Sequence, residues 1–330
     1  MRDERFDVFS ALLLRLYRAS AETSLESYQD TALGIIKPLL PFDGAMWGTA
    51  TFLDGVGIDI HTIHLHQQSP EMIVEYEAVK HLDTSAALVT GEPQVTKGFH
   101  SPSWFDGGAR WNDYREWQRR HGHENVFITA ATDQHSGATQ WFSLFRADID
   151  QHCRSEEVGW LAQLSPHLMQ GLSHNRARYL DSVSLLPGDA SLEAAIADAR
   201  GVVHYATPGC EEMLRAEFGR TGQGGRLPSA LMEWMRARPE PFVGRTFAAM
   251  HRVRKDLLFI RLRALCAADS LPPRQREAAE LMAQGLTHKQ VAQRLGRAPA
   301  TVRNQMQEVY RKLGVQSVAA LAQALNQARG

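Results

Sequence analysis

Short apolar stretches bounded by turn residues alternate with longer amphipathic segments along the first half of the chain. Such stretches predict β-strands, and apolar positions three or four residues apart predict helices. Strands are expected at residues 45–52, 56–66, 126–132 and 139–146, with turns at 53–55 and 133–137. Helices are expected at 6–40 (as a pair), 69–80, 112–121 and 155–179, with a possible kink at Pro166. Residues 91–112 are expected to form an irregular segment without regular secondary structure.

This order of elements predicts an antiparallel sheet with helices packed on it, which is an α+β sensor-like domain over residues 1–182. A second, smaller unit is expected at 190–267. Its pattern predicts a turn then a strand at 199–206, helices at 208–218 and 229–238, and strands at 241–251 and 257–263. A loop containing Gly222, Gly224 and Gly225 separates the two helices.

The last part of the chain, residues 271–330, has a purely helical pattern. Gly285 ends a first helix, Thr287 is a good N-cap for a second, Gly296 marks a turn, and Pro299 falls at the first position of a third. In that third helix Val302, Met306, Val309 and Leu313 recur at helical spacing, so they form one stripe that must face a core. An all-α domain is therefore predicted at 271–330.

The opposite face of the third helix is mostly polar, and its side chains have lengths suited to base edges and phosphates. They are Ala300, Thr301, Arg303, Asn304, Gln307, Glu308 and Arg311. A helix of this size fits the major groove of B-DNA. A short helix, a glycine turn and such a third helix make a helix-turn-helix, so we expect double-stranded DNA as a partner.

Charge is distributed unevenly, although the net charge of the chain is only -1. Residues 271–330 hold nine Lys+Arg and three Asp+Glu, a net of +6, which leaves -7 for the remainder. A basic end on an acidic body is expected when one module meets phosphates, although chance clustering would give the same pattern.

The C-terminal segment resembles the DNA-binding domain of the LuxR family. The matching strings are LPPRQRE (Leu271–Glu277), GLTHKQVA (Gly285–Ala292), TVRN (Thr301–Asn304) and KLGV (Lys312–Val315). Arg297-Ala298 replaces the family's usual Ile-Ser, Gln305 its common histidine, and His288 its usual asparagine.

The resemblance implies roles for individual residues. Arg303 and Asn304 would approach bases, Val302 would lie near a thymine methyl group, and Thr287, Lys289 and Thr301 would hold the phosphate backbone; Arg311 and Lys312 could reach phosphates. The apolar stripe argues that Val302 belongs mainly to the core. The alternative for Arg303 and Arg311 is that they lie on a solvated helix face.

A last helix is expected after Ser317, with Val318, Leu321, Ala322 and Leu325 along one stripe. In the LuxR family this helix pairs two copies, which implies a homodimer on a two-fold DNA site. The alternative is that the stripe packs only on its own domain.

The front of the chain resembles GAF domains and, more loosely, the ligand domains of quorum-sensing regulators. Tyr76 and Asp83 fall in the order of that second family, with Thr84 where it has proline. The smaller unit resembles a PAS domain through Asp198, Gly201, Ala206 and Pro208. Trp104, Trp111 and Trp117 form a dense aromatic patch, and Trp47 lies on a strand.

These aromatic residues, with Tyr76 and Asp83, are candidates to line a pocket for a small organic effector. The alternative is that they are ordinary core aromatics or belong to a dimer surface.

Other chemistry has little support. His64 and His66 share a strand face, but no helical histidine pair of a hydrolytic zinc site is present, so we expect no metal and no cofactor. The sequence contains no nucleotide-binding loop and no nucleophile elbow, so we expect that the protein is not an enzyme. Three separated cysteines and the absence of a signal-peptide pattern or apolar span fit a cytoplasmic protein without membrane contact. Alternatives are a phosphorelay response regulator and an enzyme with an appended DNA module.

Overall fold

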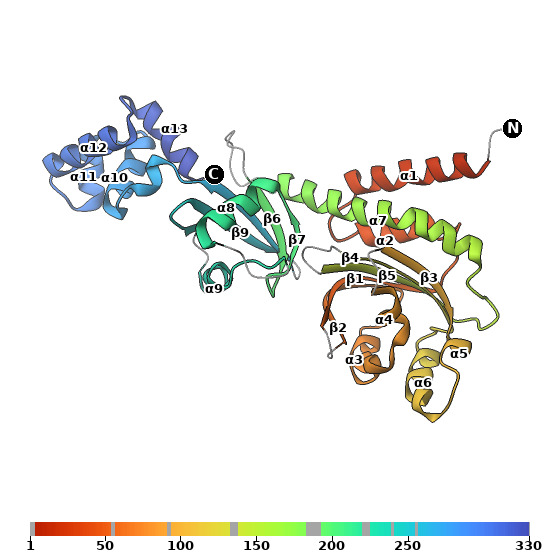
Figure 1. The fold of residues 1–330 in the computed structure, drawn as a ribbon. Coiled ribbons are helices and arrows are strands. Elements are labelled where there is room, and N and C mark those ends of the chain that lie inside the picture. Colours follow the sequence, from red (N-terminus) through yellow and green to blue (C-terminus); the bar gives the residue numbers. More distant parts are fainter. Residues whose placement is uncertain are drawn as a thin grey trace.

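The computed structural model describes residues 4–53, 57–90, 94–132, 138–182, 193–219, 225–238, 241–254 and 257–329. The turn expected at 53–55, the turn at 133–137, Gly222 and Gly224 fall wholly or mainly outside these ranges. The described strands form two antiparallel five-stranded sheets with packed helices, and a helical region follows. The predicted fold class, an α+β front followed by an all-α end, is confirmed (Figure 1).

The first sheet has the strand order β2-β1-β5-β4-β3. Its strands are β1 (Gly44–Leu53), β2 (Gly57–His66), β3 (Gln94–His100), β4 (Asn125–Thr132) and β5 (Ala138–Arg146). The prediction that residues 91–112 are irregular was wrong, because β3 lies there as an edge strand. Only Val95 and Phe99 of β3 are buried apolar residues, so its pattern is weak. A Cβ at Gly98 would lie 2.5 Å from Cys153 Cβ, so this strand needs a glycine where the chain approaches it.

One face of this sheet is covered by α1 (Glu4–Glu22), α2 (Tyr28–Ile36) and α7 (Ser155–Ser182), which lie above it in Figure 1. Helix α7 runs through Pro166 without interruption. A proline cannot donate a hydrogen bond to the carbonyl four residues earlier, that of Ala162. The Ser165 hydroxyl donates to this carbonyl instead, at 3.3 Å.

The other face is covered by a group of short helices (Figure 1). They are α3 (Glu71–Val79), η1 (Lys80–Leu82), α4 (Thr84–Thr90), α5 (Ser101–Trp104), η2 (Ala109–Trp111) and α6 (Asn112–Arg120). The sequence predicted α3 and α6 but not α4, whose seven residues are too short for a clear helical period.

The second sheet has the order β7-β6-β10-β9-β8, so its first to fifth strands are arranged as in the first sheet. The strands are β6 (Glu193–Asp198), β7 (Val203–Ala206), β8 (Phe242–Val243), β9 (Phe247–Arg254) and β10 (Leu257–Ala264). Helices α8 (Pro208–Phe218) and α9 (Ser229–Ala237) pack on one face. The sequence missed β6, and the strand expected at 241–251 is divided at 244–246. There the Glu217 carboxylate accepts from the backbone N–H groups of Arg245 and Thr246.

Two contacts join the second sheet to the first group of elements. The last turn of α7 packs on the second sheet, where Leu180 meets Ile196 and Phe259, and the ring of Tyr179 lies edge-on to Phe259. Arg200 donates to the Asp59 carboxylate of β2 and to the Ile60 carbonyl, both at 2.7 Å.

The C-terminal region consists of η3 (Ala267–Ser270), α10 (Pro273–Ala283), α11 (His288–Leu295), α12 (Pro299–Leu313) and α13 (Val318–Arg329). A buried ion pair connects it to the second sheet. Arg263 at the end of β10 makes two hydrogen bonds to the Asp269 carboxylate, at 2.6 and 2.8 Å. The same guanidinium donates to the carbonyl of Ala328 near the end of α13. We call these contacts the Arg263 latch.

Candidate nucleic-acid interface and sensor pocket

Helix α12 buries the predicted apolar stripe. Val302, Met306 and Val309 each have no exposed surface, and Leu313 packs at the edge of the same core. Val291 and Ala292 of α11 and Ala278 of α10 complete this core. The stripe therefore fixes which face of α12 points away from the domain.

The helix ends have the cap residues that the sequence indicated. Thr287 caps α11 in a reciprocal arrangement, in which its hydroxyl accepts from Gln290 N–H and the Gln290 side chain accepts from Thr287 N–H. Gly296 ends α11 and Gly314 ends α12, with φ angles of 62° and 65° that favour glycine. Helix α12 begins at Pro299 and has no side-chain cap, as Ala298 implied.

The outward face of α12 carries the predicted polar set. Its exposed residues include Ala300, Thr301, Arg303, Asn304, Gln307, Glu308 and Arg311. Within the described part of the chain, the side chains of Arg303, Asn304 and Arg311 make no hydrogen bond or ion pair. Their donors and acceptors are therefore free to meet another molecule, and an exposed N-terminal half of a helix is the part that enters a groove.

The other predicted DNA contacts lie in different surroundings. Lys289 is exposed on α11, whereas the Thr287 hydroxyl is engaged in its helix cap. Lys312 is half-buried and its ammonium contacts Gln275 (3.1 Å) and Glu308 (3.5 Å). Val302 lies in the core, which agrees with the stripe rather than with an exposed contact.

Arg297 replaces an apolar residue of the resembled family, and the structure shows what it does. Its guanidinium contacts the Gln305 side chain (3.3 Å), the Arg274 carbonyl (3.4 Å) and the Glu277 carboxylate (3.5 Å). These contacts tie α10 to α12. Where the family has an apolar residue, this chain therefore joins α10 and α12 by hydrogen bonds from the Arg297 guanidinium.

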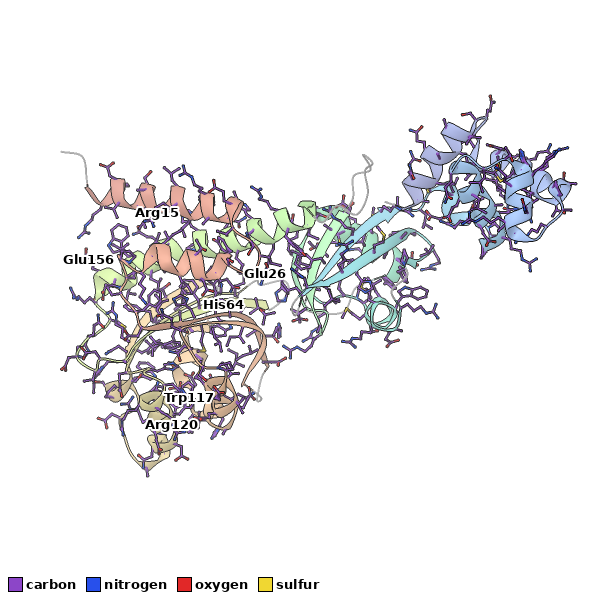
Figure 2. All side chains as sticks on the ribbon, turned by 180° about the vertical axis from the view of Figure 1, so that it is seen from behind. Arg15, Glu26, His64, Trp117, Arg120 and Glu156 are labelled. Carbon is purple, nitrogen blue, oxygen red and sulfur yellow. The ribbon has the colours of Figure 1, made fainter. Side chains whose placement is uncertain are left out.

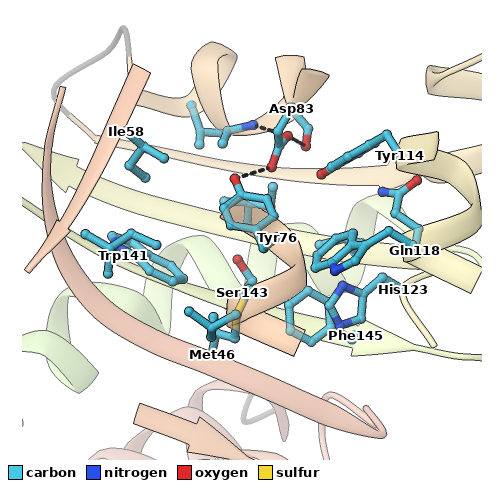
Figure 3. Close-up of a pocket in the computed structure, with 18 residues that line it drawn as sticks. Met46, Ile58, Tyr76, Asp83, Tyr114, Gln118, His123, Trp141, Ser143 and Phe145 are labelled. Carbon is cyan, nitrogen blue, oxygen red and sulfur yellow. Dashed lines mark hydrogen bonds between the residues drawn. The ribbon is translucent and has the colours of Figure 1, made fainter. Parts of the chain in front are cut away.

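The short helices α3, α4 and α6 enclose a cavity of about 60 Å³ against the first sheet (Figure 3). Its lining is mostly apolar, with a few polar groups. The residues are Met46, Ile58, Ile60, Ile73, Tyr76, Asp83, Ser85, Ala86, Val89, Tyr114, Trp117, Gln118, His123, Val126, Ile128, Trp141, Ser143 and Phe145. This volume holds on the order of four to six water molecules, so a ligand of more than a few atoms must displace side chains.

Asp83 organises one end of the cavity (Figure 3). Its carboxylate accepts from the Tyr76 hydroxyl at 2.9 Å, from the Ser85 hydroxyl at 2.5 Å and from the Ala86 N–H at 2.9 Å. Burial, together with the negative charge of Asp83, raises the pKa of Tyr76 and of Tyr114 well above the ordinary value. Both phenols are therefore neutral donors.

Two further residues with polar groups line this cavity. His123 is stacked on the ring of Phe145, with 3.6 Å between ring centroids, and burial lowers the pKa of His123 to about 3. Its imidazole is therefore neutral at pH 7. Trp141 is almost fully buried, and its Nε1 donor has no hydrogen-bond partner among the described residues. A buried unpaired donor costs free energy, so Trp141 is suited to meet an acceptor on a ligand.

The structure brings together only part of the predicted aromatic set. Tyr76, Asp83 and Trp117 line the cavity. Trp47 lies on the opposite face of the sheet, in the core beneath α1, α2 and α7. Trp104 is 43% exposed and donates to the Thr84 hydroxyl, and Trp111 packs on Phe105 outside the cavity.

Sequence reasoning missed the residues that β5 contributes. Trp141, Ser143 and Phe145 point to one face because strand side chains alternate, and that face is the cavity wall. Alternation would have grouped these residues, but it does not say which face of a sheet is covered by helices.

The geometry of α10 to α12 defines a helix-turn-helix DNA-binding domain. Residues 269–325 match the family of bacterial regulatory proteins known as the luxR family. The chain thus carries, at residues 269–325, a helix-turn-helix domain of the luxR family. Among curated proteins no match was found. Of the helices in the described ranges, none is long and apolar enough to cross a membrane.

Solved structures show weaker likenesses. An N-acylhomoserine lactone-dependent LuxR-family transcription factor, CepR2 from Burkholderia cenocepacia, is 17% identical with a TM-score of 0.37, over 54% of this chain and 97% of that one. SdiA from Escherichia coli is 10% identical with a TM-score of 0.36, over 98% and 96%. At TM-scores below 0.5, these likenesses establish neither a ligand nor a partner for this chain.

Proposed function

We propose that this protein is a one-component regulator that binds a two-fold DNA operator as a homodimer and responds to a small organic effector. The observation that carries the DNA part is the outward face of α12. There the side chains of Arg303, Asn304 and Arg311 have no partner among the described residues, while the opposite stripe is buried. Because chromosomal DNA is its partner, we place the protein in the cytoplasm.

Within the DNA complex, Arg303 and Asn304 read bases, since an arginine pairs with guanine and an asparagine with adenine in the major groove. Thr301, Lys289 and Arg311 hold phosphates, and the Thr287 end of α11 presents its backbone to the same strand. Lys312 must break its ion pair with Glu308 to reach a phosphate, so we assign it a smaller contribution to DNA binding.

Pairing through α13 supplies the second copy. Leu321 and Leu325 are buried in their own domain, whereas Val318, one turn before Ala322, is 40% exposed. The remaining apolar surface of α13 is small, so we propose that DNA and the front units contribute to holding the dimer together. One helix-turn-helix makes few phosphate contacts, and two copies double them.

The effector occupies the cavity beside Asp83. An acceptor on the effector meets Trp141 Nε1, a donor meets the Asp83 carboxylate, and an apolar body lies against Ile58 and Ile60. The strand that carries Ile58 and Ile60 also contacts Arg200, in the turn between β6 and β7. The last strand of that second sheet, β10, ends at the Arg263 latch. A shift of β2 therefore reaches the DNA-binding domain through packed contacts.

Selection of bound duplexes from a random pool, at a stated salt concentration and with or without cell-extract metabolites, tests the DNA proposal. We expect a palindromic consensus. The variant R303A is expected to lose roughly 1–3 kcal/mol of specific binding and to relax one position of each half-site. The control R254Q, on the exposed end of β9, should bind like the original protein. Equal loss on all sequences would make Arg303 a phosphate anchor, and no salt-sensitive binding at all would refute the proposal.

Tryptophan fluorescence across a panel of small metabolites tests the effector proposal. A responding compound should bind W141F at least tenfold more weakly, since the lost donor is worth about 1.4 kcal/mol. W104F, at a tryptophan outside the cavity, is the matched control. No response from any compound, or equal affinity for W141F, would refute the assignment of the effector to this cavity.

A further inference from the structure

A cluster of potential metal ligands lies on the other face of the first sheet from the sensor pocket. Asp30 in the first turn of α2 meets His64 and His66 near the end of β2, and Figure 2 shows His64 beneath the N-terminal helices. His64 Nε2 lies 2.9 Å from Asp30 Oδ1, and His66 Nδ1 lies 2.7 Å from the same oxygen. One donor atom from each residue falls within 4.8 Å of the others.

The backbone explains why these side chains meet. Residues 64 and 66 of a strand point to the same face, and His64 is paired across the ladder with Trp47, which points toward the helices. Gln67, directly after His66, has a φ of 53°, a left-handed conformation that is unusual for a residue other than glycine. Strained backbone of this kind is concentrated at ligand sites.

Among the described residues, neighbouring side chains hold the histidines in place without supplying another acid to the cluster. The ring of Phe42 lies edge-on to His66, with 5.9 Å between centroids. The nearby cation, Lys37, is occupied by the Gln67 side chain at 3.1 Å and by the ring of Phe42. The imidazoles are 17% and 15% exposed, whereas the Asp30 side chain is 50% exposed, so the cluster opens to solvent at the carboxylate.

The distances match a coordination geometry. Ligands at right angles around an ion, with bonds of 2.0–2.1 Å, lie about 2.9 Å apart, whereas tetrahedral ligands lie about 3.3 Å apart. The two N···O distances of 2.7 and 2.9 Å are those of hydrogen bonds, and they also suit the first arrangement. Two histidines and one carboxylate leave the remaining coordination positions of an ion for water, and first-row divalent ions adopt such a ligand set in proteins.

We propose that Asp30, His64 and His66 form a binding site for a divalent first-row transition-metal ion, with water molecules on the solvent side. Binding changes no oxidation state. In each neutral imidazole the proton moves from the ligating nitrogen to the other ring nitrogen, and the ion replaces both hydrogen bonds to Asp30. The occupied site clamps α2 to the edge strand β2.

Metal titration of the full-length, tag-free protein after chelator treatment tests the site. We expect calorimetry with Ni²⁺ and Zn²⁺ to give one saturable site per chain. We expect Co²⁺ to give the weak visible absorption of a six-coordinate ion. The variants H64Q and H66Q keep a side-chain donor for Asp30 but lose the ligand, so each should bind at least tenfold more weakly. H81Q, at an exposed histidine of η1, is the matched control.

A second measurement distinguishes loss of the metal site from unfolding of the variant. D30N preserves the shape of the carboxylate and an acceptor for both histidines, and it should also weaken binding. Ni²⁺ should raise the unfolding temperature of the original protein and of H81Q, but not of H64Q or D30N. The proposal would be overturned if the original protein had no saturable site, or if the H64Q/H66Q double variant bound the metal with equal affinity. The cluster would then be only two hydrogen bonds between the histidines and Asp30.

Discussion

Replacing Arg263 by methionine is expected to release the C-terminal domain from the second sheet. The side chains of Arg263 and Asp269 are only 8% and 5% exposed, so the variant leaves a buried carboxylate without its main partner. Removing one member of a buried pair typically costs 3–5 kcal/mol. Arg276 lies 3.9 Å from Asp269 and can compensate in part, so we expect a loss of about 3 kcal/mol.

Hydrogen exchange measures this loss where it occurs. A local cost of about 3 kcal/mol speeds opening on the order of 100-fold, since 1.4 kcal/mol is a factor of ten. The faster exchange should appear in η3 and α13, and not in β4 or β5. The exposed pair Arg254–Glu26 provides the control, because R254Q removes a surface interaction worth at most about 1 kcal/mol.

The double variant R263M/D269L separates charge from packing. Two apolar side chains of similar volume should recover much of the stability, since a buried pair is often no better than apolar packing. The reasoning is refuted if R263M exchanges no faster than R254Q, or if the first sheet is loosened equally.

The latch also has a pH dependence. Burial alone would raise the pKa of Asp269, but the hydrogen bonds from Arg263 and from Cys266 N–H hold it below the ordinary value. A carboxyl group whose pKa is lowered in the folded protein stabilises it above the unfolded pKa, and this stabilisation is lost as the pH falls through the folded pKa. The latch is therefore expected to hold at neutral pH and to weaken in acid.

Three further predictions concern the DNA-binding core, a helix cap and the sensor pocket. M306A, at a fully buried position of α12, should destabilise the C-terminal domain by about 2–5 kcal/mol in chemical denaturation, and a smaller loss would contradict the buried stripe. T287A should cost about 1 kcal/mol through the lost cap of α11, whereas T301A on the exposed face should change stability little. His123 has a folded pKa of about 3, below the unfolded value, so protons favour the unfolded state, and stability should fall as the pH drops from about 6.5 toward 3. H123F should remove that part of the slope, and an unchanged slope would show that His123 is not buried.

The helix-turn-helix was predictable because its signals are local. A stripe at helical spacing, two glycine ends and one threonine cap determine α11 and α12 without reference to the rest of the chain. Strand β6 was not predictable in the same way. Its sequence, EAAIAD, is rich in alanine, which favours helices, and only pairing with β10 and β7 makes it a strand.

The pocket was predicted in part for a related reason. Tyr76 and Trp117 lie on helices that close over the sheet, so aromatic density located them. The sequence grouped Trp47 with the pocket residues, but it lies on the other face of the sheet. Its neighbour on β1, Met46, lines the cavity, and alternation sends these two side chains to opposite faces. Which face becomes the cavity side depends on where α3 to α6 pack, which is a property of the tertiary structure.

Helix α7 gives the front of the molecule an unusual dependence on one segment. Its first turns belong to the core of the first sheet, while Leu180 near its end covers Ile196 and Phe259 of the second. A fragment that starts at residue 193 would expose that apolar surface to water and would be expected to aggregate. Any dissection of this protein into separately expressed pieces must therefore carry the end of α7 with the second sheet, although α7 precedes that sheet in the chain.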